Sequence, residues 1–374
     1  MTFFRSYRFF LPFLLVLALE IFFRLGLYEP FVKRQSHAGR SIQLKKAVNE
    51  HGKRRIHFVT LGDSRVDHGL DHKYLLRTSK KYNADHVSFA MPGTHLMTLE
   101  VLWGWLGKDF PDFKGVLLGL SSSSMLKVGN GAYELGMVQP FRSMGDFAGV
   151  LPHVPFNPGR LETYGGVSAL FQYRLDFKDL IFHPLRRLGY AVFGRPSHWK
   201  DILAHGPINN FNICSIDFKS PKSCLQSLRQ IESGSITRKA EEDLGRNHTV
   251  CTKYSNKRPI ESILSGQGKK IKESWRSLIE SIASKKKLIV VLMPEHSFIR
   301  RYYTPDGSHQ WALSILAPLE EEGKLVLIDL RRRFSNEEEC RFFIDPLHLN
   351  TTGMKTITRE IIPLLKTNFY QTHN

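Results

Sequence analysis

The sequence predicts an α/β protein with a doubly wound parallel sheet, covered by helices in a three-layer α/β/α arrangement. Short apolar runs alternate with segments of helical spacing along both ends of the chain. Most of the runs stop at turns rich in Gly, Pro or Ser. The chain has 374 residues, of which 42% are hydrophobic, so it can bury a large core. Strands that alternate with helices are typical of parallel sheets.

Five strands are expected, three early in the chain and two late. The early part comprises strands at 56–62, 86–91 and 115–120 and helices at about 70–81 and 94–108. The late part comprises helices at 269–286, 308–322 and 351–366 and strands at 287–294 and 324–330. Between them the regular alternation stops. We therefore expect one sheet domain that is interrupted in mid-chain by a large insertion.

Composition divides the chain into four regions. They are an N-terminal membrane anchor at 1–29, a basic polar stalk at 30–54, the α/β domain at 55–124 and 266–374, and an insertion or cap at 125–265. The insertion is rich in Gly, Pro and aromatic residues, with helical pieces expected at 167–190 and 221–246. It has no visible internal repeat.

The N-terminal region contains an apolar segment, FFLPFLLVLALEIFF at 9–23, that extends to about 20 residues with the apolar residues before position 29. This length suits a bilayer span. Glu20 and Arg24 interrupt its end at a spacing that allows an ion pair. A buried amphipathic helix is the alternative, but we predict a single-pass anchor because the segment has no polar face. No small-x-small cleavage site follows it.

The orientation of this anchor stays open. We expect the domain that follows it to be extracytoplasmic. However, Arg5 and Arg8 precede the span, whereas Arg24, Lys33 and Arg34 follow it. The positive-inside rule therefore does not favour export of the domain.

A formal net charge of +18 favours anionic partners, namely membrane lipids, an acidic polymer or nucleic acid. Zinc-finger spacing and an aromatic-basic RNA signature are both absent from the sequence, so we do not expect nucleic acid. Four cysteines show no metal-ligand spacing, and neither a metal nor a cofactor is expected. Cys214, Cys224 and Cys251 fall close together, and the sequence is equally compatible with a disulfide among them and with free thiols.

Several candidate catalytic residues follow the ends of the expected strands. Ser64 lies in the turn Gly62-Asp63-Ser64, Gly93 follows the second strand and Ser121 follows the third. Asp345 and His348 lie three residues apart before the last helix. A nucleophilic serine requires a base, a carboxylate that orients the base, and donors for the oxyanion. Ligands of doubly wound sheets bind at these carboxyl ends, so the residues are expected to converge.

These motifs, in this order, resemble the blocks of the SGNH/GDSL hydrolase superfamily, whose sheet is flavodoxin-like. The matching residues are Gly62-Asp63-Ser64, Ala90-Met91-Pro92-Gly93 and Asp345-Pro346-Leu347-His348, within about 56–124 and 287–366. The resemblance implies that Ser64 is the nucleophile and that His348 is its base, oriented by Asp345. It also implies that the backbone N–H groups of Ser64 and Gly93 bind the oxyanion.

One block departs from the family pattern. Its third block is Gly-x-Asn-Asp, whose Asn donates to the oxyanion, but this chain has Gly119-Leu120-Ser121-Ser122. The Ser121 hydroxyl could donate from a shorter side chain. Loss of one oxyanion donor typically costs about 2.7–4 kcal/mol of barrier. The chain therefore resembles divergent membrane-anchored members that lack this Asn and handle acyl groups on cell-surface polymers, as in alginate acetylation and teichoic-acid D-alanylation.

The function expected from these residues is that of a membrane-anchored serine esterase or O-acyltransferase. Its substrate would be an acyl ester of a cell-surface glycan or lipid. The alternative is an inactive scaffold of the same fold that binds an anionic polymer or an assembly partner. Arg65 could bind an anionic substrate or could equally be a solvated or capping residue. Asp67 and His68 are expected at the edge of the pocket or on the surface.

Overall fold

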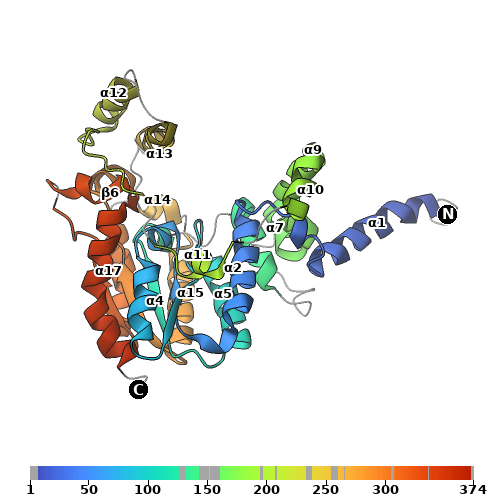
Figure 1. Ribbon diagram of the computed structural model, residues 1–374, viewed down its shortest axis with the longest axis horizontal. Coiled ribbons are helices and arrows are strands. Elements are labelled where there is room, and N and C mark those ends of the chain that lie inside the picture. Colours follow the sequence, from blue (N-terminus) through green and yellow to red (C-terminus); the bar gives the residue numbers. More distant parts are fainter. Residues whose placement is uncertain are drawn as a thin grey trace.

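A five-stranded parallel sheet forms the centre of the computed structural model (Figure 1), confirming the predicted α/β class. The structure describes residues 7–126, 131–142, 151, 161–193, 197–206, 209–232, 238–253, 260–264, 266–304, 307–335 and 337–371. The strand order is β2-β1-β3-β4-β5. The strands are β1 (Ile56–Leu61), β2 (Asp85–Ser88), β3 (Gly115–Leu120), β4 (Lys287–Leu292) and β5 (Val326–Asp329).

Alternate residues of the strands pack into two separate cores, one on each face of the sheet. On β3, Val116 and Leu118 belong to the first core, whereas Leu117 belongs to the second. The first core lies under α5 (Leu96–Asp109), α15 (Gly268–Ala283) and α16 (Ser308–Glu321). The second lies under α4 (His72–Lys80) and α17 (Thr351–Leu365). Because both faces are covered, the central strand β3 has no charged or polar side chain along its length and all six of its residues are buried.

Residues 30–54 differ from the predicted stalk. Most of this segment forms α2 (His37–His51), which begins where the Ser36 hydroxyl accepts a hydrogen bond from the Gly39 N–H at 3.1 Å. Leu44, Ala47 and Val48 of α2 are buried in the first core. The segment is basic overall, but these apolar residues share one helical face, which attaches the helix to the domain.

The N-terminal helix α1 (Tyr7–Arg24) projects away from the rest of the molecule (Figure 1). Its C-terminal end is attached to the body through Glu20. The carboxylate pairs with Arg24 at 2.6 Å and accepts the N–H groups of Ala169 and Leu170 at 2.7 and 3.0 Å. Among the described residues, we find no helix whose length and apolar content would suffice to cross a membrane. Residues 1–6 of the predicted anchor lie outside the described residues.

The mid-chain insertion contributes two separate groups of helices (Figure 1). Beside α1 lie α7 (Leu161–Val167), α8 (Ala169–Gln172), α9 (Arg174–Phe182) and α10 (Pro184–Phe193). Above β6 (Phe343–Asp345) lie α12 (Pro221–Glu232) and α13 (Arg238–Lys253). The described insertion also contains α6 (Gly131–Val138), α11 (Trp199–Leu203) and α14 (Ile260–Leu264). Other parts of the predicted insertion lie outside the described residues.

All four cysteines form disulfides, which decides between the two alternatives left open by the sequence. Cys214 pairs with Cys340, and Cys224 pairs with Cys251. The first bond joins the insertion to the segment just before the hairpin of β6 (Phe343–Asp345) and β7 (His348–Leu349). The second joins α12 to α13.

Removal of the Cys214–Cys340 bond is expected to destabilise the chain. The double variant Cys214→Ser/Cys340→Ser should lose about 2–5 kcal/mol of unfolding free energy, since the bond restricts the unfolded chain. The bonded residues are 126 positions apart, against 27 for Cys224–Cys251. The loop-entropy relation therefore predicts a loss about 1.4 kcal/mol smaller for Cys224→Ser/Cys251→Ser. Urea unfolding followed by circular dichroism measures both, and equal midpoints for all three proteins would contradict the expectation.

Candidate active site

The turn after β1 presents Ser64 at the carboxyl end of the sheet. Gly62 has a φ of +154°, and a Cβ there would clash with Val66 and with the carbonyl of Gly119. Asp63 then caps the short helix α3 (Ser64–Asp67) by accepting the Arg65 N–H at 2.9 Å. The close approach of this turn to β3 requires glycine. Ser64 consequently starts a helix directly above the sheet.

Ser64, His348 and Asp345 form one hydrogen-bonded chain. The Ser64 hydroxyl lies 2.9 Å from Nε2 of His348, although the two residues are 284 positions apart. Nδ1 of His348 lies 2.9 Å from Oδ2 and 3.1 Å from Oδ1 of Asp345. With the proton on Nδ1, the imidazole donates to the carboxylate and accepts from the serine. This is the arrangement that general-base activation of a serine requires.

The β6–β7 hairpin holds Asp345 in a fixed position. Oδ1 of Asp345 accepts the backbone N–H groups of Leu347 and His348 at 2.7 and 3.0 Å. These bonds close the turn and aim the carboxylate at the imidazole. The sequence predicted a loop here, and the structure instead forms two short antiparallel strands that pair Asp345 with His348.

Opposite pKa shifts follow from this pairing. Burial alone would raise the pKa of Asp345, but the adjacent His348 and the two backbone N–H groups outweigh burial and lower it. Burial alone would lower the pKa of His348, but the charge of Asp345 and its hydrogen bond outweigh burial and raise it above 6.5. Asp345 thus stabilises the imidazolium that forms when His348 takes a proton.

Two backbone N–H groups remain candidates for the oxyanion. Within the described part of the chain, neither the Ser64 N–H nor the Gly93 N–H has a hydrogen-bond acceptor. Gly93 has a φ of +84°, and a Cβ there would lie 3.1 Å from the His37 ring. The Met91 N–H donates to the Gly62 carbonyl at 3.0 Å, which holds the Gly93 loop against the serine turn. Both residues therefore lie on loops that meet at the same sheet edge.

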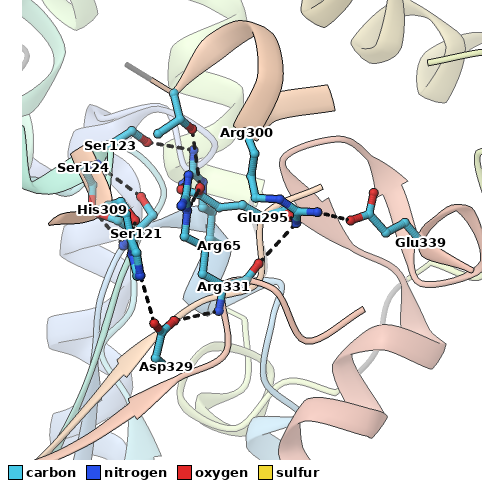
Figure 2. Close-up of polar contacts among 12 residues, drawn as sticks. Arg65, Ser121, Ser123, Ser124, Glu295, Arg300, His309, Asp329, Arg331 and Glu339 are labelled. Carbon is cyan, nitrogen blue, oxygen red and sulfur yellow. Dashed lines mark hydrogen bonds and ion pairs between the residues drawn. The ribbon is translucent and has the colours of Figure 1, made fainter. Parts of the chain in front are cut away.

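Ser121 follows β3 and belongs to a tight turn of serines (Figure 2). Its N–H donates to Oγ of Ser124 at 3.1 Å, and its own Oγ accepts the Ser124 N–H at 3.2 Å. The Ser121 hydroxyl proton has no acceptor among the described residues, and the side chain is almost fully buried. Its predicted role as a third oxyanion donor stays a prediction.

The Arg65 side chain lies in a buried ion-pair cluster (Figure 2). Its guanidinium lies 3.1 Å from Glu295 and 3.2 Å from the Ser123 hydroxyl. Glu295 also accepts from Arg331 at 2.8 Å, so two arginines share one buried carboxylate. The guanidinium is therefore engaged within the protein, and a contact between Arg65 and substrate stays a prediction.

A cavity of about 110 Å³ opens beside His348. His68 lines it, with its ring centroid 5.4 Å from that of His348. Burial lowers the pKa of His68 to about 4, so the ring is neutral at pH 7. The other lining residues are Asn209, Arg246, Ile344, His348, Leu349, Asn350, Thr351 and Met354.

The insertion supplies two residues of this cavity that the sequence did not indicate. Arg246 lies on α13, and Asn209 lies before α12 and donates to Asp243 at 3.1 Å. Neither falls in a recognisable motif, and their positions depend on how the insertion packs. The insertion therefore forms part of the wall of the site.

One further group has the composition of a metal site. Asp67, His72 and His205 offer ligand atoms that lie within 4.8 Å of one another. Asp67 Oδ1 and His205 Nε2 are 3.2 Å apart, close to the ligand spacing of about 3.3 Å in tetrahedral zinc sites. In the structure the same His205 nitrogen bonds the Asp67 carbonyl at 2.8 Å. The group was not visible in the sequence, because the insertion brings His205 to it.

Comparison with known proteins adds no relative. No family model matches the chain, and no curated protein matches it in sequence.

Proposed function

We propose that this chain is a serine esterase or O-acyltransferase that forms an acyl-enzyme on Ser64. One observation carries the proposal: the hydrogen-bonded chain from Ser64 through His348 to Asp345 at the carboxyl end of the sheet. The resemblance of its motifs to the SGNH/GDSL hydrolases, and the flavodoxin-like strand order, support the same reading. The proposed substrate is an acyl ester of a cell-surface glycan or lipid.

The reaction divides into two half-reactions. His348 takes the Ser64 proton at Nε2 while Oγ attacks the acyl carbonyl carbon. The N–H groups of Ser64 and Gly93 would stabilise the resulting oxyanion. The intermediate then collapses, the bond to the leaving alcohol breaks, and the imidazolium returns its proton to that alcohol. In the second half, His348 deprotonates water or a sugar hydroxyl, whose oxygen attacks the acyl carbonyl carbon. The bond between that carbon and Ser64 Oγ then breaks, and the imidazolium returns its proton to Oγ.

The choice between water and a sugar hydroxyl depends on access to the acyl-enzyme. His348 is only partly exposed, and part of the insertion closes one side of its cavity. Exclusion of bulk water would favour transfer over hydrolysis. The same site could carry out both reactions, and the access of water to the acyl-enzyme would decide between O-acyl transfer and ester hydrolysis.

We further propose that α1 anchors the protein to a membrane and that the catalytic domain is extracytoplasmic. Consecutive side chains of α1 from Leu14 to Leu17 are exposed and apolar, and such a helix is expected in lipid. The two disulfides, which persist in oxidising compartments, support an exported domain.

A second candidate function is an inactive scaffold that binds an anionic polymer. A groove of about 480 Å³ supports it, because Arg300, Arg301 and Arg332 line the groove together with two serines. Serine in place of the family's oxyanion Asn also supports it. Recovery of the protein with an acidic polymer, combined with an unreactive Ser64, would favour this candidate.

Labelling with a fluorophosphonate probe tests the proposed function. The detergent-solubilised wild-type chain should react, and mass spectrometry should place the adduct on Ser64. His348→Ala should abolish labelling, because the serine then lacks its base. His198→Ala is the matched control, since that histidine is exposed on the surface. No labelling of folded wild-type protein would reject the catalytic proposal.

A further inference from the structure

Exposed hydrophobic side chains are concentrated in two segments of the chain. Of the 20 large hydrophobic residues exposed in the described part, ten lie between Phe10 and Leu27 and eight between Tyr164 and Val192. The other two, Tyr74 and Leu364, stand alone on the sheet domain. Scattered exposed hydrophobic residues are normal on proteins, but a concentration of this kind indicates an interaction surface.

These two segments are packed together. The Phe23 ring of α1 lies 5.5 Å from the Phe177 ring of α9, and the Tyr28 hydroxyl donates to Asp176 at 2.6 Å. Arg187 of α10 is fully buried and pairs with the same Asp176, which holds α10 against α9. Figure 1 shows α9 and α10 beside the attached end of α1. Their exposed apolar residues therefore belong to one end of the molecule.

The most exposed part of this surface is the turn between α9 and α10. Ile181, Phe182 and Leu185 are 60%, 67% and 84% exposed. Along α10, Leu185, Leu188 and Val192 recur at i, i+3 and i+7 and so share one helical face. An apolar turn followed by an amphipathic helix is the pattern of helices that lie in the interface of a bilayer.

We propose that the α9–α10 hairpin is a second membrane-contact site, which inserts the turn at Ile181–Leu185 into the bilayer that α1 enters. This inference rests on the membrane anchor of the proposed function. The partner is a lipid bilayer, because the hairpin is attached to the base of α1 and must lie near any membrane that α1 enters. Lys178 is exposed beside the turn and suits anionic headgroups, whereas Arg186, also exposed, pairs with Asp179 at 3.1 Å.

Contact at this second point would also fix the orientation of the catalytic domain. A lone helical anchor leaves the domain free to tilt about its attachment, whereas a second membrane contact beside the anchor would restrict that tilt. The edge of the sheet that carries Ser64 would then keep a fixed orientation relative to the membrane surface. Such an orientation suits a substrate that is itself attached to the cell surface.

Site-specific fluorescence in vesicles tests this proposal. All four cysteines are in disulfides, so one introduced cysteine gives a unique attachment point for the NBD fluorophore. The full chain carrying Leu185→Cys is reconstituted into phosphatidylcholine vesicles containing phosphatidylglycerol. Its emission should be about threefold higher than that of the matched Leu364→Cys protein and quenched by doxyl-labelled lipids, since only the first probe leaves water. Leu364 is 38% exposed on α17, on the sheet domain.

Four outcomes would overturn the proposal. Quenching of the Leu185→Cys probe by aqueous iodide, as fully as the Leu364→Cys probe, would place the turn in water. Protection from both iodide and doxyl lipid would assign the surface to a second protein copy. A Leu14→Cys probe reports on α1 separately: lipid quenching there but not at Leu185→Cys would reject the hairpin alone. Water exposure at both positions would reject the anchor as well. The fluorescence results at Leu14→Cys and Leu185→Cys are independent of the reactivity of Ser64, which the fluorophosphonate probe measures.

Discussion

Replacement of Ser64 by alanine is expected to lower kcat for the hydrolysis of p-nitrophenyl acetate by about 10⁶-fold. In the proposed mechanism His348 and Asp345 act on the reaction through the Ser64 oxygen, so both would lose their effect when that oxygen is removed. The Ser64 hydroxyl makes one described side-chain hydrogen bond, at 2.9 Å to His348. The urea midpoint should therefore change little while the rate collapses. Initial rates measured by absorbance, with unfolding curves in parallel, check both expectations.

A matched control distinguishes the effect of losing the Ser64 hydroxyl from the effect of losing a serine hydroxyl elsewhere in the chain. Ser284→Ala removes an exposed hydroxyl at the end of α15 that bonds only the local Ser281 carbonyl at 3.1 Å. Its rate should equal that of the wild type. A Ser64→Ala protein that retains more than about a tenth of the wild-type rate would show that another group attacks the ester, since triad serines contribute far more than this.

The strands could be predicted where burial on both faces left a continuous apolar run. For β3 the predicted and observed bounds coincide at 115–120, and all six residues are buried. For β2 the prediction extended to Met91, but the strand ends at Ser88. Its last apolar residues still lie beside the continuation of β1, because the Phe89 N–H donates to the Thr60 carbonyl at 2.8 Å and the Met91 N–H donates to the Gly62 carbonyl at 3.0 Å. The Met91 contact depends on the neighbouring loop, which a local pattern does not contain.

The burial of helix α2 could not be predicted from its composition. Its basic composition predicted a solvated stalk, yet the spacing of a few apolar residues decides its position. Leu44 and Val48 recur at i and i+4 and are almost completely buried. A narrow apolar face is enough to attach a helix when the sheet offers an uncovered surface.

The candidate triad could be predicted because each member occupies a local motif. Ser64 begins a helix after a strand, and Asp345 and His348 close one turn, so a parallel sheet brings them to the same edge. The pocket residues Asn209 and Arg246 could not be predicted. They come from the insertion, where the chain has no regular period and tertiary packing alone sets the positions.

Replacement of Asp345 by asparagine should change both the rate and its pH dependence. The charge of Asp345 and its hydrogen bond raise the pKa of His348, whereas burial opposes them. The active form needs neutral His348, so wild-type kcat/KM should rise with pH through a midpoint above 6.5. Asparagine removes the charge but leaves the burial. The midpoint should therefore move to lower pH, while kcat at pH 8 falls by roughly 10⁴-fold because the tautomer is no longer held.

The same substitution should alter the pH dependence of stability. The pKa of Asp345 is lowered in the folded chain, so its contribution is present above the unfolded pKa and is lost as pH falls through the folded value. Because Asp345 also raises the pKa of His348, the stability difference between wild type and Asp345→Asn should be largest in mild acid, where Asp345 is ionised and His348 is protonated, and should shrink in stronger acid. Urea unfolding measured from pH 7 downward gives this difference.

Asp329→Asn is the matched control for both effects. Asp329 lies 3.1 Å from His309 at the end of β5, a second carboxylate–histidine pair of similar geometry that does not include Ser64. If the raised pKa of His348 limits catalysis, Asp329→Asn must leave the pH midpoint unchanged. A midpoint that stays constant in Asp345→Asn, despite a lower rate, would mean that the titrating base is not His348. The pairing at 345–348 would then serve the stability of the hairpin rather than the activation of Ser64.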